Sequence, residues 1–257
     1  MSADKPWLTT PLGQSLLAAE RELMRGVLEG LFGEYCVQLG GWGEPECFVS
    51  MARTQRAAVI GVPGDTGVGA RALPERLPLE SDSVDVLLLP HTLDYCEQPH
   101  AALREASRVL RSDGQVVLLG FKPGGLWGLK RVLPGQDCPT GTRRLVGPRN
   151  LTDWLELLDL RIVESQRYFF RWPRATNAQP VSTTWESFGR RFWPELGACY
   201  LLRSQKRMRT LTPVRQLWKR PAKVVTGLVE PSARMTRADW PRRRQVVPIR
   251  RDDWSRT

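Results

Sequence analysis

The sequence predicts an α/β fold in which a mostly parallel sheet is covered by helices on both faces. Two near-continuous apolar segments, 84–89 (VDVLLL) and 115–121 (QVVLLGF), are typical of strands buried on both sides. Between them, segment 99–110 places Leu103 and Ala106 on one face of an amphipathic helix. Strands that alternate with helices favour parallel pairing through right-handed crossovers. The 257 residues suffice for one such domain of about 200 residues and an extension.

The chain opens with a predicted helix. Pro11 suits the first helical position and Thr10 can cap it, because Pro lacks the amide hydrogen that this position leaves unused. Apolar residues then recur at helical spacing over residues 12–31, and Gly33 suits the end of the helix.

The elements that follow are short. Segment 35–39 is predicted to be a strand that runs into the glycine-rich segment 40–43. A short helix is expected over 44–52 and a second strand over 57–62. Segment 63–78 is rich in Gly and Pro, which indicates a loop with one weak strand.

The second half of the chain is less regular. Ser112 to Gly114 is predicted to turn the chain before the strand 115–121. Beyond it we expect a helix over 149–158, a strand over 161–170, a helix over 182–192 and a strand over 197–203.

The positive charge is concentrated at the C-terminus. Residues 203–257 hold 16 Lys/Arg and 4 Asp/Glu, a net charge of +12, which leaves −1 for residues 1–202. We therefore predict three regions: a helical extension (1–33), an α/β domain (34–207) and a basic, disordered tail (208–257). Because the tail interleaves Arg with Trp, it suits nucleic acid, notably single-stranded RNA, or an anionic membrane surface; a solubilising extension without a partner is the alternative.

Other classes of protein are disfavoured by composition. The five cysteines are scattered without a C-x-x-C pair, which argues against a disulfide framework and a zinc ribbon. With two histidines, a His-rich metal site is not expected. No apolar run has the roughly 20 residues of a transmembrane helix, and the N-terminus lacks the pattern of a secretory signal, so we expect a cytoplasmic protein.

Two consecutive segments carry a family resemblance. Segment 77–95 (LPLESDSVDVLLLPHTLDY) is similar to a pattern in which LPF, polar residues and SFD precede an apolar strand and H-x-L-E. Segment 98–114 (QPHAALREASRVLRSDG) is similar to D-P-x-x-x-L-R-E-x-x-R-V-L-K-P-G-G. Both patterns are those of the class I S-adenosylmethionine-dependent methyltransferase superfamily, of the type-11-like kind. The chain most resembles an uncharacterised bacterial group within it, with a degenerate glycine-rich motif.

This resemblance implies a Rossmann-like, seven-stranded sheet with S-adenosylmethionine at the carboxyl ends of its first strands. The family has an acid two residues before G-x-G-x-G in the loop beside the methionine moiety. Here the aligned residues are Gln38, Gly40, Trp42 and Glu44, with Gly41 and Gly43 between them. Only the first glycine is retained, and an indole at the second could fill space that the cofactor needs.

The resemblance also implies cofactor contacts after the second strand and after the strand 84–89. The family's ribose-binding acid falls at Pro63, with Asp65 two residues on as a substitute. Pro90 and His91 follow the other strand and are cofactor contacts by analogy, although His91 could simply be packed at a turn. Lys122 could orient an anionic methyl acceptor or be a solvated loop lysine.

Three functions stay open on the sequence. The first is a methyltransferase that uses S-adenosylmethionine and an unidentified methyl acceptor, small molecule or macromolecule. It needs no conspicuous catalytic residue, because the sulfonium already activates the methyl group and the protein mainly aligns donor and acceptor. The second is a non-catalytic scaffold with the methyltransferase fold. The third is an RNA-binding protein that uses the basic Arg/Trp tail.

Overall fold

The computed structural model describes residues 6–44, 48–65, 67–124, 127, 142, 145–170 and 197–207. The helix expected over 182–192 and the tail 208–257 lie outside these residues. Among the described helices, none combines the length and the apolar composition needed to cross a membrane.

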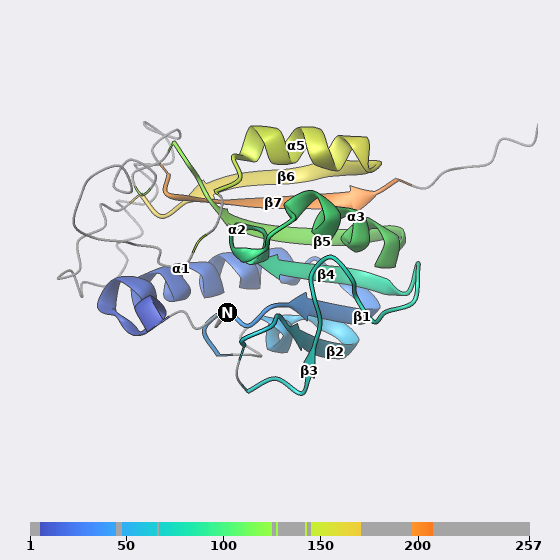
Figure 1. Ribbon diagram of the computed structural model, residues 1–257, viewed down its shortest axis with the longest axis horizontal. Coiled ribbons are helices and arrows are strands. Elements are labelled where there is room, and N and C mark those ends of the chain that lie inside the picture. Colours follow the sequence, from blue (N-terminus) through green and yellow to red (C-terminus); the bar gives the residue numbers. More distant parts are fainter. Residues whose placement is uncertain are drawn as a thin grey trace, which may run out of the picture. The chain divides into compact units, whose positions relative to one another are not determined.

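Seven strands form one sheet in the order β3-β2-β1-β4-β5-β7-β6 (Figure 1). β7 runs antiparallel to both of its neighbours, β5 and β6, and the remaining neighbours pair in parallel. The predicted seven-stranded, mostly parallel sheet is therefore confirmed. The strands are β1 (Phe32–Leu39), β2 (Arg53–Gly61), β3 (Ala70–Arg71), β4 (Val84–Pro90), β5 (Leu110–Phe121), β6 (Leu160–Tyr168) and β7 (Cys199–Lys206).

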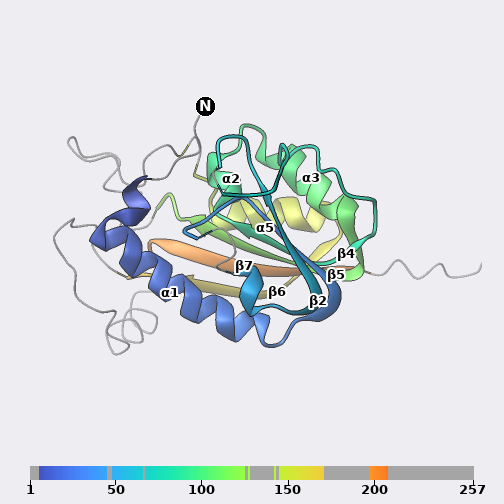
Figure 2. The ribbon, with the colours of Figure 1, turned by 90° about the horizontal axis from the view of Figure 1, so that it is seen from below.

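Helices cover both faces of the sheet, with α1 on one face and α3 and α5 on the other (Figure 2). Thr10 caps α1 as expected, since its hydroxyl accepts a hydrogen bond from the Gly13 amide at 3.3 Å. The helices are η1 (Pro6–Thr9), α1 (Pro11–Leu28), η2 (Val49–Met51), α2 (Thr92–Tyr95), α3 (Pro99–Val109) and α5 (Pro148–Leu157).

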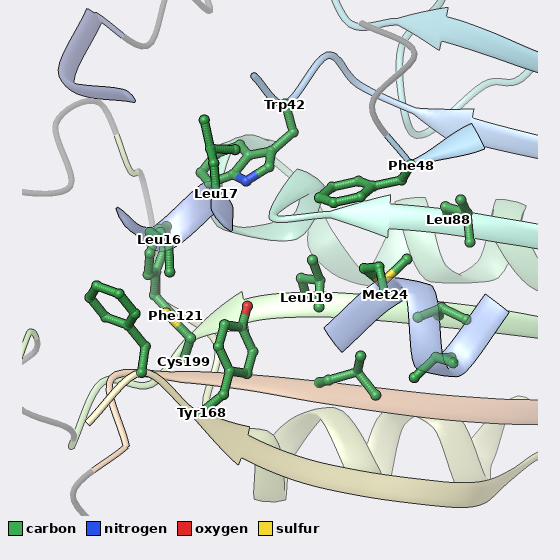
Figure 3. Close-up of a cluster of buried hydrophobic side chains, with 14 of the residues drawn as sticks. Leu16, Leu17, Met24, Trp42, Phe48, Leu88, Leu119, Phe121, Tyr168 and Cys199 are labelled. Atoms are coloured by element: carbon green, nitrogen blue, oxygen red, sulfur yellow. The ribbon is translucent and has the colours of Figure 1, made fainter. Parts of the chain in front are cut away.

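The core under α1 is built from the apolar stripe of that helix and the inward side chains of β4 and β5. Figure 3 shows Leu16 and Met24 of α1 together with Leu88 of β4 and Leu119 of β5 in this cluster. All four are at most 3% exposed, so each contributes about 1.5–3 kcal/mol through burial. The predicted N-terminal helix thus packs directly against the sheet.

The opposite core lies under α3 and α5, and the segment with the family resemblance builds much of it. Leu103 and Ala106 of α3 are buried against this face of the sheet, as their spacing predicts. Arg108 of the same helix donates hydrogen bonds to the carbonyls of Leu77 (3.3 Å) and Leu79 (2.9 Å). The LREASRVL motif therefore fastens the loop before β4 to α3.

Four expected elements differ in the structure. The first helix, expected to continue to residue 31 with Gly33 at its end, stops at Leu28, and Gly33 lies in β1. Within the described part of the helix expected over 44–52, the structure has only the 3₁₀ turn η2. The turn expected at 112–114 is instead part of β5: Asp113 adopts a φ of 74° there, and the pairing with β4 shifts register. β2 begins at Arg53 rather than 57, because its pairing with β1 extends back to Phe32.

Candidate active site at the carboxyl ends of the strands

The glycine-rich loop starts where β1 ends. The Gly40 amide donates to the Ile60 carbonyl of β2 at 2.8 Å, which holds the loop against the neighbouring strand. Gly40 and Gly43 have φ values of 89° and 67°, a region that glycine enters without steric penalty. The two glycines therefore allow the chain to reverse over the edge of the sheet, with Trp42 between them.

Asp65 joins this loop to the turn after β2. One oxygen of its buried carboxylate accepts hydrogen bonds from the amides of Gly41 (2.6 Å) and Val62 (3.0 Å). Pro63 is exposed on the same turn. The structure thus places an acid at the end of β2, two residues after the position at which the resemblance expects one.

Gln38 stabilises the glycine-rich loop through its side chain. Its side chain is fully buried, and Nε2 donates to the Gly40 carbonyl at 3.0 Å. The preceding carbonyl, that of Leu39, accepts a hydrogen bond from the Thr92 hydroxyl of α2 at 2.6 Å. Residues after β1 and after β4 are therefore brought together, as expected for parallel strands that end at one edge.

Pro90 and His91 are buried at the end of β4. The His91 amide donates to the Leu119 carbonyl of β5 at 2.9 Å, and the residue has a φ of 53°. A positive φ is uncommon for a non-glycine residue and is frequent at functional sites. It turns the chain from β4 into α2 and directs the imidazole under α1.

A buried polar cluster, which we call the Glu20 cluster, lies at this end of the sheet: Glu20, Trp42, His91, Asp94 and Tyr168. One oxygen of Glu20 lies 2.9 Å from Nε2 of His91 and accepts the Tyr168 hydroxyl at 2.9 Å. The other oxygen accepts the indole N–H of Trp42 at 2.6 Å. Nδ1 of His91 lies 3.1 Å from Oδ2 of Asp94.

Two aromatic rings pack against the His91 imidazole. The Trp42 ring stacks on it with centroids 4.2 Å apart, and the Phe121 ring lies at 4.0 Å on a tilted plane. Figure 3 shows Trp42 and Phe121 entering the same cluster, one from the glycine loop and the other from the end of β5. Both rings are fully buried.

Burial and the two carboxylates set the protonation of this cluster. Burial alone would lower the pKa of His91, but the charge of Glu20 and the hydrogen bonds from both carboxylates outweigh it and raise the pKa. Burial also raises the pKa of Asp94, against the opposing influence of His91. The pKa of Tyr168 lies well above its ordinary value, because of burial and then the charge of Glu20. The cluster thus favours an imidazolium between two carboxyl groups.

His91 therefore does not offer a nitrogen to a ligand in this conformation. Each ring nitrogen faces a carboxylate, and the rings of Trp42 and Phe121 pack against the imidazole. A general base needs a free lone pair within reach of the proton it removes. The contact of the His91 side chain with a cofactor stays a prediction.

The remaining candidates are placed as follows. Lys122 is buried after β5, where its amide donates to the Ala198 carbonyl at 2.9 Å, so it is not a solvated loop lysine. Among the residues that the structure describes, no group of His, Cys, Asp or Glu could hold a metal ion.

Sequence reasoning missed Glu20, Asp94 and Tyr168. A signal for Glu20 exists, because it lies four residues after Leu16 and four before Met24, on the apolar stripe of α1. A fully buried acid at such a position needs partners, and they come from three other segments.

Comparisons with known proteins agree with this geometry. Residues 52–118 match the methyltransferase domain family. The chain is 30% identical over 225 residues to the uncharacterized protein YafS of Escherichia coli (strain K12), covering 84% of this chain and 87% of YafS.

Two solved structures have the same fold. The first, a SAM-dependent methyltransferase of Thermotoga maritima, matches with a TM-score of 0.54 at 20% identity, covering 79% of this chain and 93% of that one. The second, a geranyl diphosphate methyltransferase solved in complex with SAM, matches with a TM-score of 0.50 at 16% identity, covering 73% and 84%. The chain therefore belongs to the family of YafS and has the fold of the class I S-adenosylmethionine-dependent methyltransferases.

Proposed function

We propose that the protein is a methyltransferase that uses S-adenosylmethionine and an acceptor of still unknown class. The observation that carries the proposal is the joining of three strand ends: Gly41 is bonded to Asp65 after β2, and Leu39 is bonded to Thr92 after β4. This is the edge of an open parallel sheet at which nucleotide-type ligands bind. The structural neighbour solved with SAM has the same fold.

The residues at this edge fit the adenosyl end of the cofactor. Asp65 supplies a carboxylate after β2, next to Gly41, whose lack of a side chain lets a ligand approach the backbone. A Cβ at Gly41 would lie 3.4 Å from that carboxylate. We assign Gln38, Gly40, Gly41, Gly43, Pro63 and Pro90 to the walls of this site.

The methionine end of S-adenosylmethionine fits this site only after Trp42 has moved. Trp42 stands at the second glycine of the family's motif, and its ring fills the space between the loop, α1 and His91. When bound, S-adenosylmethionine supplies an activated methyl group, so that the protein contributes alignment and exclusion of water. The aromatic rings around His91 suit the exclusion of water.

The test is calorimetric titration of the purified protein with S-adenosylmethionine and S-adenosylhomocysteine. Binding at micromolar concentration supports the proposal, and an Asp65→Asn variant is expected to bind at least tenfold more weakly, since a charged hydrogen bond to a hydroxyl contributes about 1.5–3 kcal/mol. An exposed control on α1, Glu22→Gln, is expected to leave the affinity unchanged. Absence of binding by the native protein refutes the proposal.

A non-catalytic role is the second candidate, and the burial of Trp42 favours it. If the indole never leaves its place, the fold serves as a scaffold without a methyl donor. The two candidates separate in the same titration, because a scaffold of this kind binds no donor unless Trp42 is removed.

The basic tail suggests a nucleic acid partner. The net charge of +12 over residues 203–257 would release counterions from phosphates on binding. Titration of labelled single-stranded RNA at several salt concentrations is expected to show affinity that falls with salt and is lost on deletion of residues 208–257. Salt-independent affinity, or affinity kept by the deletion, argues against this partner. We also propose a cytoplasmic location, which the scattered spacing of the five cysteines supports.

A further inference from the structure

Trp42 combines two features that rarely occur together. Its ring is fully buried and touches Trp7, Tyr95, His91 and Phe121. Its backbone belongs to a loop with glycines on both sides and no regular secondary structure. Loops open locally at a lower free energy than core helices and strands, so this buried ring is carried by a segment of low local stability.

The loop is bonded to the sheet before Trp42, whereas after Trp42 the described chain is held by the exposed ion pair of Glu44 with Arg21 of α1 at 3.6 Å. The amides of Gly40 and Gly41 bond to Ile60 and Asp65, so the chain before Trp42 is fixed to β2 and its turn. On the other side, Gly43 has a left-handed φ and is exposed. A Cβ at Gly43 would lie 3.0 Å from Leu17 of α1. Rotation about Trp42 and Gly43 can therefore move the indole without breaking the anchored part.

One polar contact ties the indole to α1. The Nε1–H group of Trp42 donates to Glu20 at 2.6 Å, a short distance typical of a charge-assisted hydrogen bond. Glu20 keeps its other oxygen on His91 and Tyr168, so it remains partly paired when the indole departs. Without that second set of contacts, opening would leave an unpaired buried carboxylate and would be prohibitive.

We propose that Trp42 is a gate on the methyl-donor site, latched by Glu20. The indole occupies the methionine end of the site until it leaves Glu20, and the donor enters only when it has left. This proposal rests on the proposed function for the identity of the ligand. Glu20 is a positioning residue in this scheme, because it acts on the ligand through Trp42.

The latch is tested first without any ligand. In protein labelled with ¹⁵N-tryptophan, the Trp42 indole signal is identified by its absence in Trp42→Phe, and its hydrogen exchange is measured. We expect exchange at least tenfold slower than that of an exposed indole, and about tenfold acceleration in Glu20→Gln, because a neutral acceptor forms the weaker bond. Glu22→Gln is the control, since Glu22 lies on the same helix with an exposed side chain paired only to Arg25 in the described residues. Fast exchange in the native protein, or no change in Glu20→Gln, overturns the latch.

The gate is tested by stopped-flow binding of S-adenosylmethionine. We expect the native rate to saturate with donor concentration, because opening limits it, and the rate in Trp42→Gly to rise at least tenfold without saturation. If Trp42→Gly does not fold, Glu20→Gln is measured in its place, because it keeps the Trp42 ring and weakens only the bond that holds it. Trp154→Phe, away from this site on α5, is the matched tryptophan control.

The outcomes separate the gate from the methyltransferase proposal. Equal rates in the native protein and Trp42→Gly overturn the gate and leave the methyltransferase proposal standing. Binding by Trp42→Gly alone supports exclusion by the indole and overturns the proposed activity of the native protein. Binding by neither overturns both.

Discussion

Glu20→Ala is the substitution to which the structure assigns the largest loss of stability. The carboxylate is fully buried and is shared by the Trp42 indole, the Tyr168 hydroxyl and His91. Removing it leaves two buried donors without this acceptor and the imidazolium with one carboxylate instead of two. All of these groups are buried, so bulk solvent does not supply the lost partner.

The magnitude follows from those contacts. A buried donor left unsatisfied costs about 1–3 kcal/mol, and removal of one partner from a buried ion pair costs about 3–5 kcal/mol. The losses are not additive, because all three contacts share one carboxylate and His91 can release its proton. We expect a fall of about 3–5 kcal/mol in the free energy of unfolding, a large part of the 5–15 kcal/mol typical of a domain.

Urea unfolding followed by circular dichroism measures this loss. The midpoint should fall with little change in the dependence on denaturant, since the surface exposed on unfolding is almost the same. Glu22→Ala, exposed on the same helix, should change stability by less than about 0.5 kcal/mol. If Glu20→Ala is too unstable to purify, Glu20→Gln should still lose about 1–2 kcal/mol. A loss below about 1 kcal/mol for Glu20→Ala would refute the view that this carboxylate organises the site.

Three further predictions concern protonation and the motif on α3. The pKa of His91 is raised above its unfolded value of 6.5, so the stabilisation from the imidazolium is complete below pH 6.5 and is lost as the pH rises through the folded pKa. The free energy of unfolding should therefore fall over this pH range. If a His91→Gln variant shows the same dependence of stability on pH, His91 is not its cause. Burial raises the pKa of Cys36 and Cys96 to about 12, so neither thiol should react with a thiol reagent at pH 8 until urea unfolds the chain. Labelling of either cysteine in the folded protein would contradict this expectation. Arg108→Leu should lower the free energy of unfolding by about 1–2 kcal/mol through the loss of bonds to the loop before β4, and no measurable loss would mean that the motif does not fasten this loop.

The sheet could be predicted from the sequence because its strongest signals are local. The VDVLLL segment reads as a strand buried on both faces, and β4 is indeed the centre of the sheet, between β1 and β5. The helix with Leu103 and Ala106 on one face was predicted to within one residue of α3. Where local signals mislead, the strand continues through an irregularity: the Ser-Asp-Gly segment that suggests a turn lies within β5, at the bulge where the pairing passes from Val84 with Leu110 to Val86 with Gln115.

The candidate site could be predicted only in part. The glycine loop, the turn with Pro63 and the end of β4 follow from chain order in a parallel sheet, and the structure brings the first and last together through Thr92. The Glu20 cluster does not follow from chain order, because Tyr168 and Glu20 are 148 residues apart in the sequence. No pattern in a single sequence pairs a helical acid with a tyrosine on a distant strand.

The departures from the family's glycine motif become consistent once Glu20 is considered. Where the family has an acid, Gln38 uses its amide nitrogen to donate to the Gly40 carbonyl, which a carboxylate cannot do. The negative charge of the site comes instead from Glu20 on α1, and the Trp42 indole that replaces a glycine is the group that bonds to it. The two replacements are thus parts of one arrangement rather than separate losses.

Gln38→Glu tests this interpretation. A further buried carboxylate would face the Gly40 carbonyl without a proton to donate, so we expect the free energy of unfolding at pH 7 to fall by about 2–3 kcal/mol. The stability should recover as the pH is lowered and the new acid is protonated. Gln38→Met, similar in shape and uncharged, is the control and should lose less and show no recovery at low pH. A Gln38→Glu protein of native stability that bound S-adenosylmethionine more tightly would show the opposite: the family's acid would then still fit its original place, and the glutamine would be a defect in an otherwise ordinary methyltransferase pocket.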